Sequence, residues 1–387
     1  MNKYIFLLLI AMLAGTQSVS AVIWRVNNNA GVSRDFISIQ EAIDAAHATN
    51  GDTIHVEGSV TPYDASGVVI TKKVFIFGPG FHLTVNPETQ HLKPSAKINN
   101  ITFNAGSAGS VLAGIEQVES TGLTLTYTAG ATQAGISVAV TNWVGARLTI
   151  NESNIRIVNC KLNWVDINNN KYLENIDIRK CWFCPGLVRT TSTSTVFSLN
   201  LVNNFFRNDL SASGYVVIDL ATSVKANIGD NTFYGGFQIN AQESHIYNNV
   251  FYNTIASRGA TALTTHATNS YDGNISNINL LGGMVNGVDR NTIRTTEATE
   301  ALSNIWFTAA GSIAMYDKYF QANTSATSPI RQAATAAGIT TGELGMFCGL
   351  SPYILSGLAN IPAVYEIVMP SEVSSDGFEV TVKVKAH

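Results

Sequence analysis

Five polar side chains recur at one position of five similar segments, and their types suit the binding of sugars or carboxylates. They are Arg156, Asp177, Asn200, Asn227 and His245. An arginine can hold a carboxylate through two parallel N–H bonds, and amides and imidazoles bond hydroxyl groups. A solvated outer face would carry the same residue types, with Arg156 and Asp177 as an ordinary surface ion pair. The choice between the two interpretations depends on the elements that carry these side chains.

The segments that carry these residues form a repeat between residues 154 and 253. Each copy alternates apolar and polar side chains, which is typical of a half-buried strand. Successive copies are 18 to 27 residues apart, a spacing typical of one coil of a solenoid. The residues expected to point inward are Ile157, Ile178, Leu201, Ile228 and Ile246.

A second position of the repeat predicts a ladder of stacked side chains. This position holds Cys160, Cys181, Asn204, Asn231 and Asn249. A buried asparagine amide can bond the asparagine of the next coil and also satisfy the backbone of the bend. Two residues further on, large apolar side chains are expected to stack in the interior: Leu162, Phe183, Phe206, Phe233 and Phe251.

The cysteines leave two interpretations open. Cys160 and Cys181 fit the ladder position as small buried residues. They also fit a disulfide, since strands of neighbouring coils lie about 4.8 Å apart. Cys181 and Cys184 form one CxxC, and Cys348 lies far along the chain. Because no second pair accompanies the CxxC and the histidines are scattered, we expect no metal site formed by these residues.

The composition agrees with a repetitive β structure. The chain has 387 residues, of which 13% are charged and 45% hydrophobic, and its net charge is −4. These values exclude a strongly basic surface for nucleic acid and an extended disordered chain. The 37 asparagines outnumber the 31 glycines, and asparagine favours turns over helix interiors. We therefore expect one long solenoid rather than two or three globular domains.

Residues 1–21 have the features of a secretory signal peptide. Lys3 precedes an apolar run over 4–14, and the stretch that ends in Ser20 and Ala21 supplies small residues before a cleavage point. We expect cleavage after Ala21. The apolar run is too short for a membrane span, and no other run is long enough. The mature protein is expected in the periplasm, on the surface or in the medium of a Gram-negative bacterium.

Segments outside the repeat resemble the ends of a known fold. Residues 36–46 look like an amphipathic capping helix, and Gly51-Asp-Thr-Ile-His-Val56 looks like the strand after it. With Tyr63 and the apolar segment 74–80, this start resembles the right-handed parallel β-helix of the pectin-lyase-like superfamily. Residues 328–353 resemble the ending of secreted bacterial members.

The resemblance implies an all-β protein with a single-stranded right-handed parallel β-helix over 22–361. The last stretch differs from the repeat. Residues 363–369 and 378–384 alternate as strands, and 374–377 have the composition of a turn. This pattern predicts a C-terminal hairpin or tail over 362–387, which we expect to cap the open end of the solenoid.

The resemblance also implies a groove along the first strand of each coil. The candidate catalytic residues there are Asp166, Asp219 and Gln238. Two carboxylates in one groove could share acid and base work or bind calcium. We expect the coil between them to offer only the threonines and serines of 190–195. The catalytic sequence signatures of the family are absent from the chain.

Two functions fit these patterns best, since a third, an autotransporter-like or virus-tail-like fibre, would need a longer or trimeric solenoid. The first is an exported β-helix that binds a polysaccharide or cell-surface glycan, or serves as a structural module, without catalysis. The second is a lyase or glycoside hydrolase that acts on an acidic polysaccharide. The low charge and the missing signatures favour the first function, because function has to be argued from a site rather than from a fold.

Overall fold

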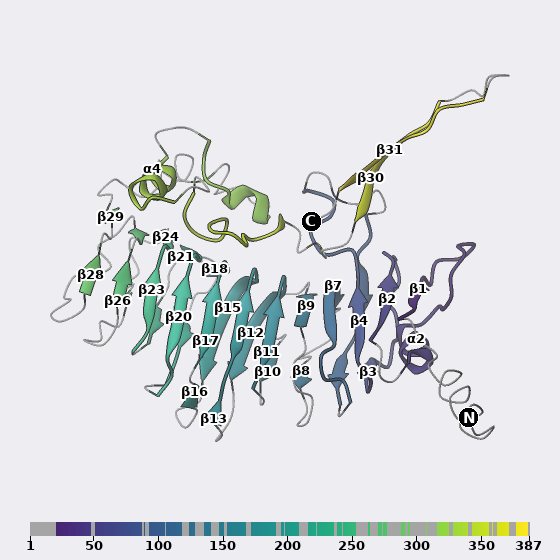
Figure 1. Ribbon diagram of the computed structural model, residues 1–387, viewed down its shortest axis with the longest axis horizontal. Coiled ribbons are helices and arrows are strands. Elements are labelled where there is room, and N and C mark those ends of the chain that lie inside the picture. Colours follow the sequence, from purple (N-terminus) through teal and green to yellow (C-terminus); the bar gives the residue numbers. More distant parts are fainter. Residues whose placement is uncertain are drawn as a thin grey trace, which may run out of the picture.

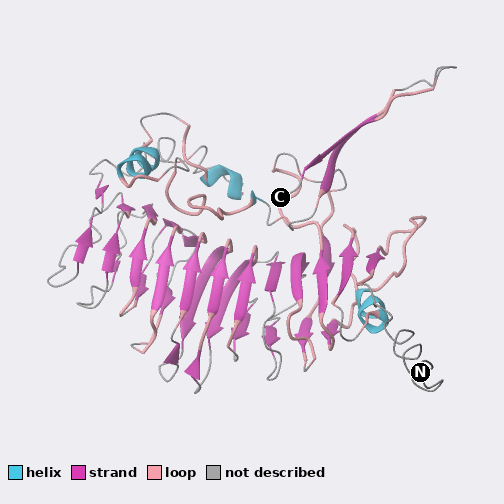
Figure 2. Cartoon of the chain, viewed as in Figure 1, coloured by secondary structure: helices cyan, strands magenta, loops and turns pink. Residues whose placement is uncertain are grey.

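The computed structural model shows a chain that is mostly β, with parallel strands in curled sheets (Figures 1 and 2). The expected signal peptide, apart from Ala21, lies outside the described residues. Among the described residues, no helix combines the length and apolarity needed to cross a membrane. The structure describes residues 21–47, 51–86, 89, 93–104, 106–117, 124–127, 135–140, 147–150, 153–167, 172–190, 195–196, 198–208, 216–221, 223–235, 238–241, 243–252, 262–263, 270–272, 274–276, 288–290, 293–294, 307, 316–324, 328–339, 343–355, 358, 362–370 and 377–385.

The first strands of the sequence repeat pair with one another in parallel and in register. Ile157 pairs with Ile178, and Leu201 pairs with both Ile178 and Ile228. These inward residues have no exposed surface, as the alternation predicts. The strands of this row are β11 (Ile155–Val158), β14 (Ile176–Arg179), β17 (Leu199–Val202), β20 (Ala226–Gly229), β23 (His245–Tyr247), β26 (Ser270–Asp272) and β28 (Val288–Arg290).

A second row follows the bend of each repeat. It holds the aromatic stack: Phe183 lies 4.7 Å from Phe206, and Phe233 lies 4.9 Å from Phe206 and 4.8 Å from Phe251, measured between ring centroids. All four rings are buried. The strands of this row are β12 (Lys161–Ile167), β15 (Trp182–Thr190), β18 (Phe205–Asn208), β21 (Thr232–Gly235), β24 (Val250–Tyr252), β27 (Ile275–Ser276) and β29 (Ile293–Arg294).

A third row continues from the later residues of β12 and β15. It contains β10 (Arg147–Ile150), β19 (Val216–Asp219), β22 (Gln238–Asn240) and β25 (Ala262–Leu263). The pairing of β12 with β15 shifts register between Leu162 and Trp164, where β15 carries extra residues. A short sheet of β13 (Tyr172–Leu173) and β16 (Thr195–Val196) also pairs in parallel.

The asparagine ladder runs through the bends between the first and second rows. The Asn231 amide donates to Leu201 O at 2.8 Å and to Asn249 Oδ1 at 3.0 Å, while its Oδ1 accepts from Asn204 N at 2.8 Å. Asn274 extends the ladder by one rung, since its Oδ1 accepts from Asn249 N at 3.0 Å. These asparagines are buried, so their bonds are shielded from water.

The residue before each ladder position adopts a left-handed conformation. The φ angles of Asn159, Lys180, Asn203, Asp230 and Asn248 lie between 51° and 57°. Asparagine and aspartate tolerate this region better than other residues with a Cβ atom. Part of the asparagine excess in the chain therefore has two structural causes: the ladder and the turn residue that precedes it.

Cys160 and Cys181 occupy the first two ladder positions as thiols. The Cys181 Sγ donates to Arg179 O at 3.1 Å, and the Cys160 Sγ donates to Val158 O at 3.5 Å. Burial, followed by the neighbouring Cys160, raises the pKa of Cys181 well above its ordinary value. The structure thus follows the interpretation of small buried residues rather than the disulfide.

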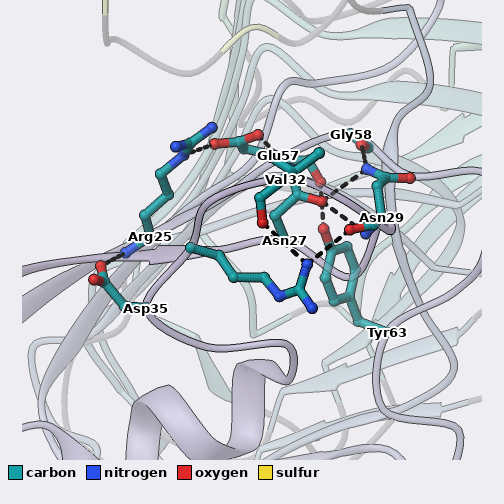
Figure 3. Close-up of polar contacts among 9 residues, drawn as sticks. Arg25, Asn27, Asn29, Val32, Asp35, Glu57, Gly58 and Tyr63 are labelled. Carbon is teal, nitrogen blue, oxygen red and sulfur yellow. Dashed lines mark hydrogen bonds and ion pairs between the residues drawn. The ribbon is translucent and has the colours of Figure 1, made fainter.

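The N-terminal end begins with a strand and a short helix. In α2 (Ile39–Ala45), the buried face is formed by Ile39, Ala42 and Ile43, and the Ser38 side chain caps the helix start. A polar network that includes Arg25, Glu57 and Asn27 fixes the loop beside this end (Figure 3). The strands of this half are β1 (Ile23–Val26), β2 (Asp52–Val56), β3 (Val68–Ile70), β4 (Val74–Phe77), β5 (Ala96–Ile98), β6 (Ile101–Phe103), β7 (Val111–Gln117), β8 (Thr124–Tyr127) and β9 (Gly135–Val140).

A C-terminal strap packs against the outside of the second row (Figure 1). We define it as the described residues between 316 and 355, which include η1 (Asp317–Phe320) and α4 (Pro329–Ala336). Its apolar side chains form a second core with Trp182, Phe205 and Tyr252. The last described strand of the parallel rows, β29, ends at Arg294, before the strap begins.

The C-terminal hairpin consists of β30 (Ala363–Val368) and β31 (Thr381–Lys385), which pair antiparallel. Its apolar side chains include Val364, Ile367 and Val382, and each is more than one third exposed. Figure 1 shows the ribbon projecting away from the parallel strands, near β4 and β7. The hairpin therefore does not cover the end of the strand rows at β28 and β29. The sequence predicts it as a cap on the open end of the solenoid.

Candidate functional site

The five polar residues of the repeat lie on one straight line across neighbouring strands. Because these strands alternate inward and outward side chains, the line faces outward: the Arg156 side chain is 59% exposed, whereas Ile157 is fully buried. We call this line the groove column. In register it passes through Phe75, Val111, Gly135, Arg156, Asp177, Asn200, Asn227 and His245.

An open groove of about 710 Å³ follows the first part of this column. From Phe75 to Asn200 the column crosses six strands, or about 24 Å at about 4.8 Å per strand. Asn227 and His245 continue the column beyond the groove lining. The lining residues are Lys73, Phe75, Gly109, Ser110, Val111, Asn154, Ile155, Arg156, Asn175, Asp177, Arg179 and Asn200.

Positive charge dominates the described lining. Asp177 forms an ion pair with Arg179. The Oδ2 atom of Asp177 also lies 3.4 Å from the Nε atom of Arg156. Lys73 adds a third cation to the lining. Beside the groove, burial, followed by the charges of Arg156 and Arg179, lowers the pKa of Lys180. Because three cations and one carboxylate line the described part of the groove, its net positive charge attracts anions. Dissolved salt screens this attraction and weakens it.

Two bonded pairs of amide groups lie along the groove column, one of them within the groove lining and the other at its edge. Asn175 Nδ2 donates to Asn154 Oδ1 at 2.9 Å, and Asn227 Nδ2 donates to Asn200 Oδ1 at 2.9 Å. Each pair joins neighbouring strands, so the amides are oriented before any ligand arrives. Oriented amides of this kind suit hydroxyl groups, which both donate and accept.

Two aromatic rings stand together at the far end of the groove column. The rings of His245 and Tyr247 stack at 4.6 Å between centroids. Tyr247 leans over Gly229 of the neighbouring strand: a Cβ atom at Gly229 would lie 2.0 Å from the ring. The glycine therefore provides the space in which the tyrosine ring lies. Burial, then Asp230, raises the pKa of Tyr247, while Arg179 opposes the shift.

The candidate catalytic aspartates lie on a different line, in the third row. Register places Arg189 directly between Asp166 and Asp219, and Asn240 beside Asp219. Arg189 is bonded to Asp166 and stands 5.6 Å from the Trp164 ring, while Asn240 Nδ2 donates to Asp219 Oδ1 at 3.0 Å.

This arrangement corrects two expectations about the third row. The residue between the aspartates is an arginine, not a threonine or serine of 190–195. Gln238 pairs with Val216 rather than with Asp219, so it stands off the line of the aspartates. Because the Arg189 guanidinium is bonded to Asp166 between the two carboxylates, their arrangement does not fit a calcium site. Within the described residues, no group of three or more histidines, cysteines or carboxylates is placed to hold a metal.

A second group of ionisable side chains is buried under the strap. The carboxylate of Asp317 accepts from Asn86 Nδ2 at 2.7 Å and from Tyr353 OH at 3.1 Å. His82 lies 3.6 Å from this carboxylate and 3.3 Å from the ammonium of Lys161. Burial lowers the pKa of Lys161. These contacts tie the strap to the sheet, so we assign the cluster a structural role.

Sequence reasoning missed several of the residues that matter. Arg179 follows Asp177 by two positions, so the strand period alone could have placed it on the same face. Lys73 and Phe75 carry no such signal, because they precede the detectable repeat. Arg189 was missed because the register shift in β15 moves it opposite Asp166.

Comparisons with known proteins identify no relative: no family model, curated protein or solved structure matches the chain.

Proposed function

We propose that this chain is an exported, right-handed parallel β-helix that binds an acidic polysaccharide along the groove column, without catalysis. The observation that carries the proposal is the groove of about 710 Å³, whose described lining holds three cations, Lys73, Arg156 and Arg179, and one carboxylate, Asp177. A linear ligand that lies across the strands meets a new side chain at each strand. The order in which the strand rows pair supports the β-helix, and the sequence of residues 1–21 supports export.

The chemistry of the groove favours binding over bond cleavage. Acid and base catalysis requires two groups with separated proton affinities in reach of one bond. In the described lining, the one carboxylate, Asp177, is held by two arginines, and the lining offers no second carboxyl group to share acid and base work with it. The arginines supply charge-assisted donors for carboxylates or sulfates, and the amides supply donors and acceptors for hydroxyl groups.

A second candidate function rests on the third row. There Asp166 and Asp219 stand two strands apart, or about 9.6 Å at the usual strand spacing. Inverting glycoside hydrolases use carboxyl groups roughly 6.5–9.5 Å apart. Arg189 lies between them and is bonded to Asp166. This line is the alternative site for a hydrolase or lyase that acts on an acidic polysaccharide.

A panel of polysaccharides separates the two functions. We expect the protein without residues 1–21 to be retained by immobilised uronate-containing or sulfated glycans at low salt, and not by neutral glycans of equal length. Binding should weaken steeply between about 0.05 and 0.5 M NaCl, because the contacts are exposed ion pairs. Release of unsaturated or reducing ends would favour the enzyme. Equal retention by neutral and acidic glycans would contradict the proposal.

Replacing Asp177 with asparagine is expected to strengthen the binding of an acidic glycan by roughly 3- to 10-fold. The substitution removes the only carboxylate of the described lining and leaves Arg156 and Arg179 without their intramolecular counter-ion. Titration calorimetry at low salt measures the change. The matched control is Glu243→Gln, which removes a surface partner of Lys225 outside the groove. Weaker binding by D177N would show that Asp177 itself contacts the ligand.

A further inference from the structure

The first strand of the described chain starts against a buried carboxylate. The backbone nitrogen of Val22 donates to Asp52 Oδ1 at 3.0 Å. The other carboxylate oxygen accepts from the Trp24 indole at 3.1 Å and from the His47 backbone at 3.0 Å. Asp52 itself has no exposed surface, whereas its partners Val22 and His47 are partly exposed.

The sequence places its expected cleavage point at the same nitrogen. Cleavage after Ala21 would make Val22 the first residue of the mature chain. Ala21 is exposed in the structure. The nitrogen that now belongs to a peptide bond would then be a terminal amine, which is protonated at neutral pH.

We infer that hydrolysis of the Ala21–Val22 peptide bond creates an α-ammonium group that pairs with Asp52 and fixes the first strand to the stack. The reaction, catalysed by a signal-type peptidase, consumes one water molecule. The water oxygen joins the carbonyl carbon of Ala21, which becomes a carboxylate, and the nitrogen of Val22 takes up protons to become the ammonium. The inference does not depend on the proposed glycan binding.

The surroundings of Asp52 favour an ionised partner. Burial raises its pKa, but the hydrogen bonds from Val22 and His47 outweigh burial and bring the pKa to about 2. The ring nitrogen Nδ1 of His47 lies 2.9 Å from the carboxylate. Lys72 is bonded to the carbonyl of Ala46, next to this site. A peptide N–H supplies one neutral donor to this anion, whereas an ammonium supplies charge and three donors.

The contact between Val22 and Asp52 is connected to the rest of the structure through the pairing of β1 with β2. Thr53 N donates to Val22 O at 2.8 Å, and β1 pairs with β2 from Ile23 onward. The next contacts of β1 belong to the network of Figure 3, where Arg25 is bonded to Glu57 and to Asp35. The residues whose attachment changes on cleavage are therefore the first ones of β1. The Thr53 amide is a local reporter of that attachment.

The test compares N-terminal forms of the same folded protein. One form begins at Val22 with a free amine, one begins at Val22 with an acetylated amine, and one retains Ala21. At pH 6.5 we expect the free-amine form to exchange the Thr53 amide proton about tenfold more slowly than the other two. Its melting temperature should be higher by about 2–4 °C. N-terminal sequencing of the exported protein should start at Val22.

The dependence on pH and on Asp52 separates the ion pair from a general end effect. The α-amine has an unfolded pKa of about 8, and pairing raises it in the folded state. Its contribution is thus complete below about pH 8 and disappears as the pH rises through the higher folded value. Asp52→Asn should abolish the difference between free and acetylated forms. If D52N does not fold, the comparison of the free-amine and acetylated forms of the chain with Asp52 still tests the inference. Equal exchange rates in the free and acetylated forms, or a mature protein that begins elsewhere, would overturn the inference.

Discussion

Replacing Asn231 with alanine is expected to lower the free energy of unfolding by about 3–5 kcal/mol. The substitution leaves the Leu201 carbonyl and the Asn204 N–H without the bonds that Asn231 supplies. Each buried polar group that loses its partner costs about 1–3 kcal/mol, and the lost side chain adds a small cavity. Urea denaturation followed by circular dichroism measures the difference.

The control for this prediction is Asn227→Ala, four residues earlier in the same repeat. Asn227 is exposed, and its amide bonds the Asn200 side chain on the outer face. Since water can replace that bond, the expected loss is within about 0.5 kcal/mol. A loss of less than 1 kcal/mol for N231A, similar to that of N227A, would show that the ladder is not a main source of stability.

Replacing both Arg156 and Arg179 with glutamine is expected to weaken the binding of an acidic glycan by about 100-fold. Each arginine should contribute about tenfold, because a charge-assisted donor to a carboxylate is lost and only a shorter, neutral amide remains. The double variant should also show a smaller dependence of binding on salt. Calorimetry or affinity electrophoresis across a salt series measures both changes.

Two matched variants sharpen this second test. Lys225→Gln removes a cation from an exposed ion pair with Glu243, outside the groove lining, and should leave binding within about twofold. The double change of Arg156 and Arg179 to lysine keeps the charge but loses the planar fork, so an intermediate loss is expected. Full binding by the double glutamine variant would place the glycan elsewhere, with the third row as the next site to test.

The repeat by itself determined the outward column and the ladder. Arg156, Asp177 and Asn200 face outward together because side chains alternate along each strand and equivalent residues stack from one copy to the next. The same regularity predicted Asn204, Asn231 and Asn249 as one bonded series. Because these features repeat, the inward and outward alternation of one strand predicts the positions of the equivalent residues in the other strands.

Only the tertiary structure decided what surrounds these columns. Lys73 and Phe75 become part of the groove because β4 and β7 stand in register with the repeat, although their segments do not resemble it. Arg189 comes between Asp166 and Asp219 because a register shift in β15 breaks the period. The strap packs where it does because its apolar side chains cover the second row. The sequence shows that these side chains are apolar, but an apolar pattern alone does not predict which surface they bury. Val22 likewise meets Asp52 only after β1 and β2 pair, since 30 residues separate them in the chain.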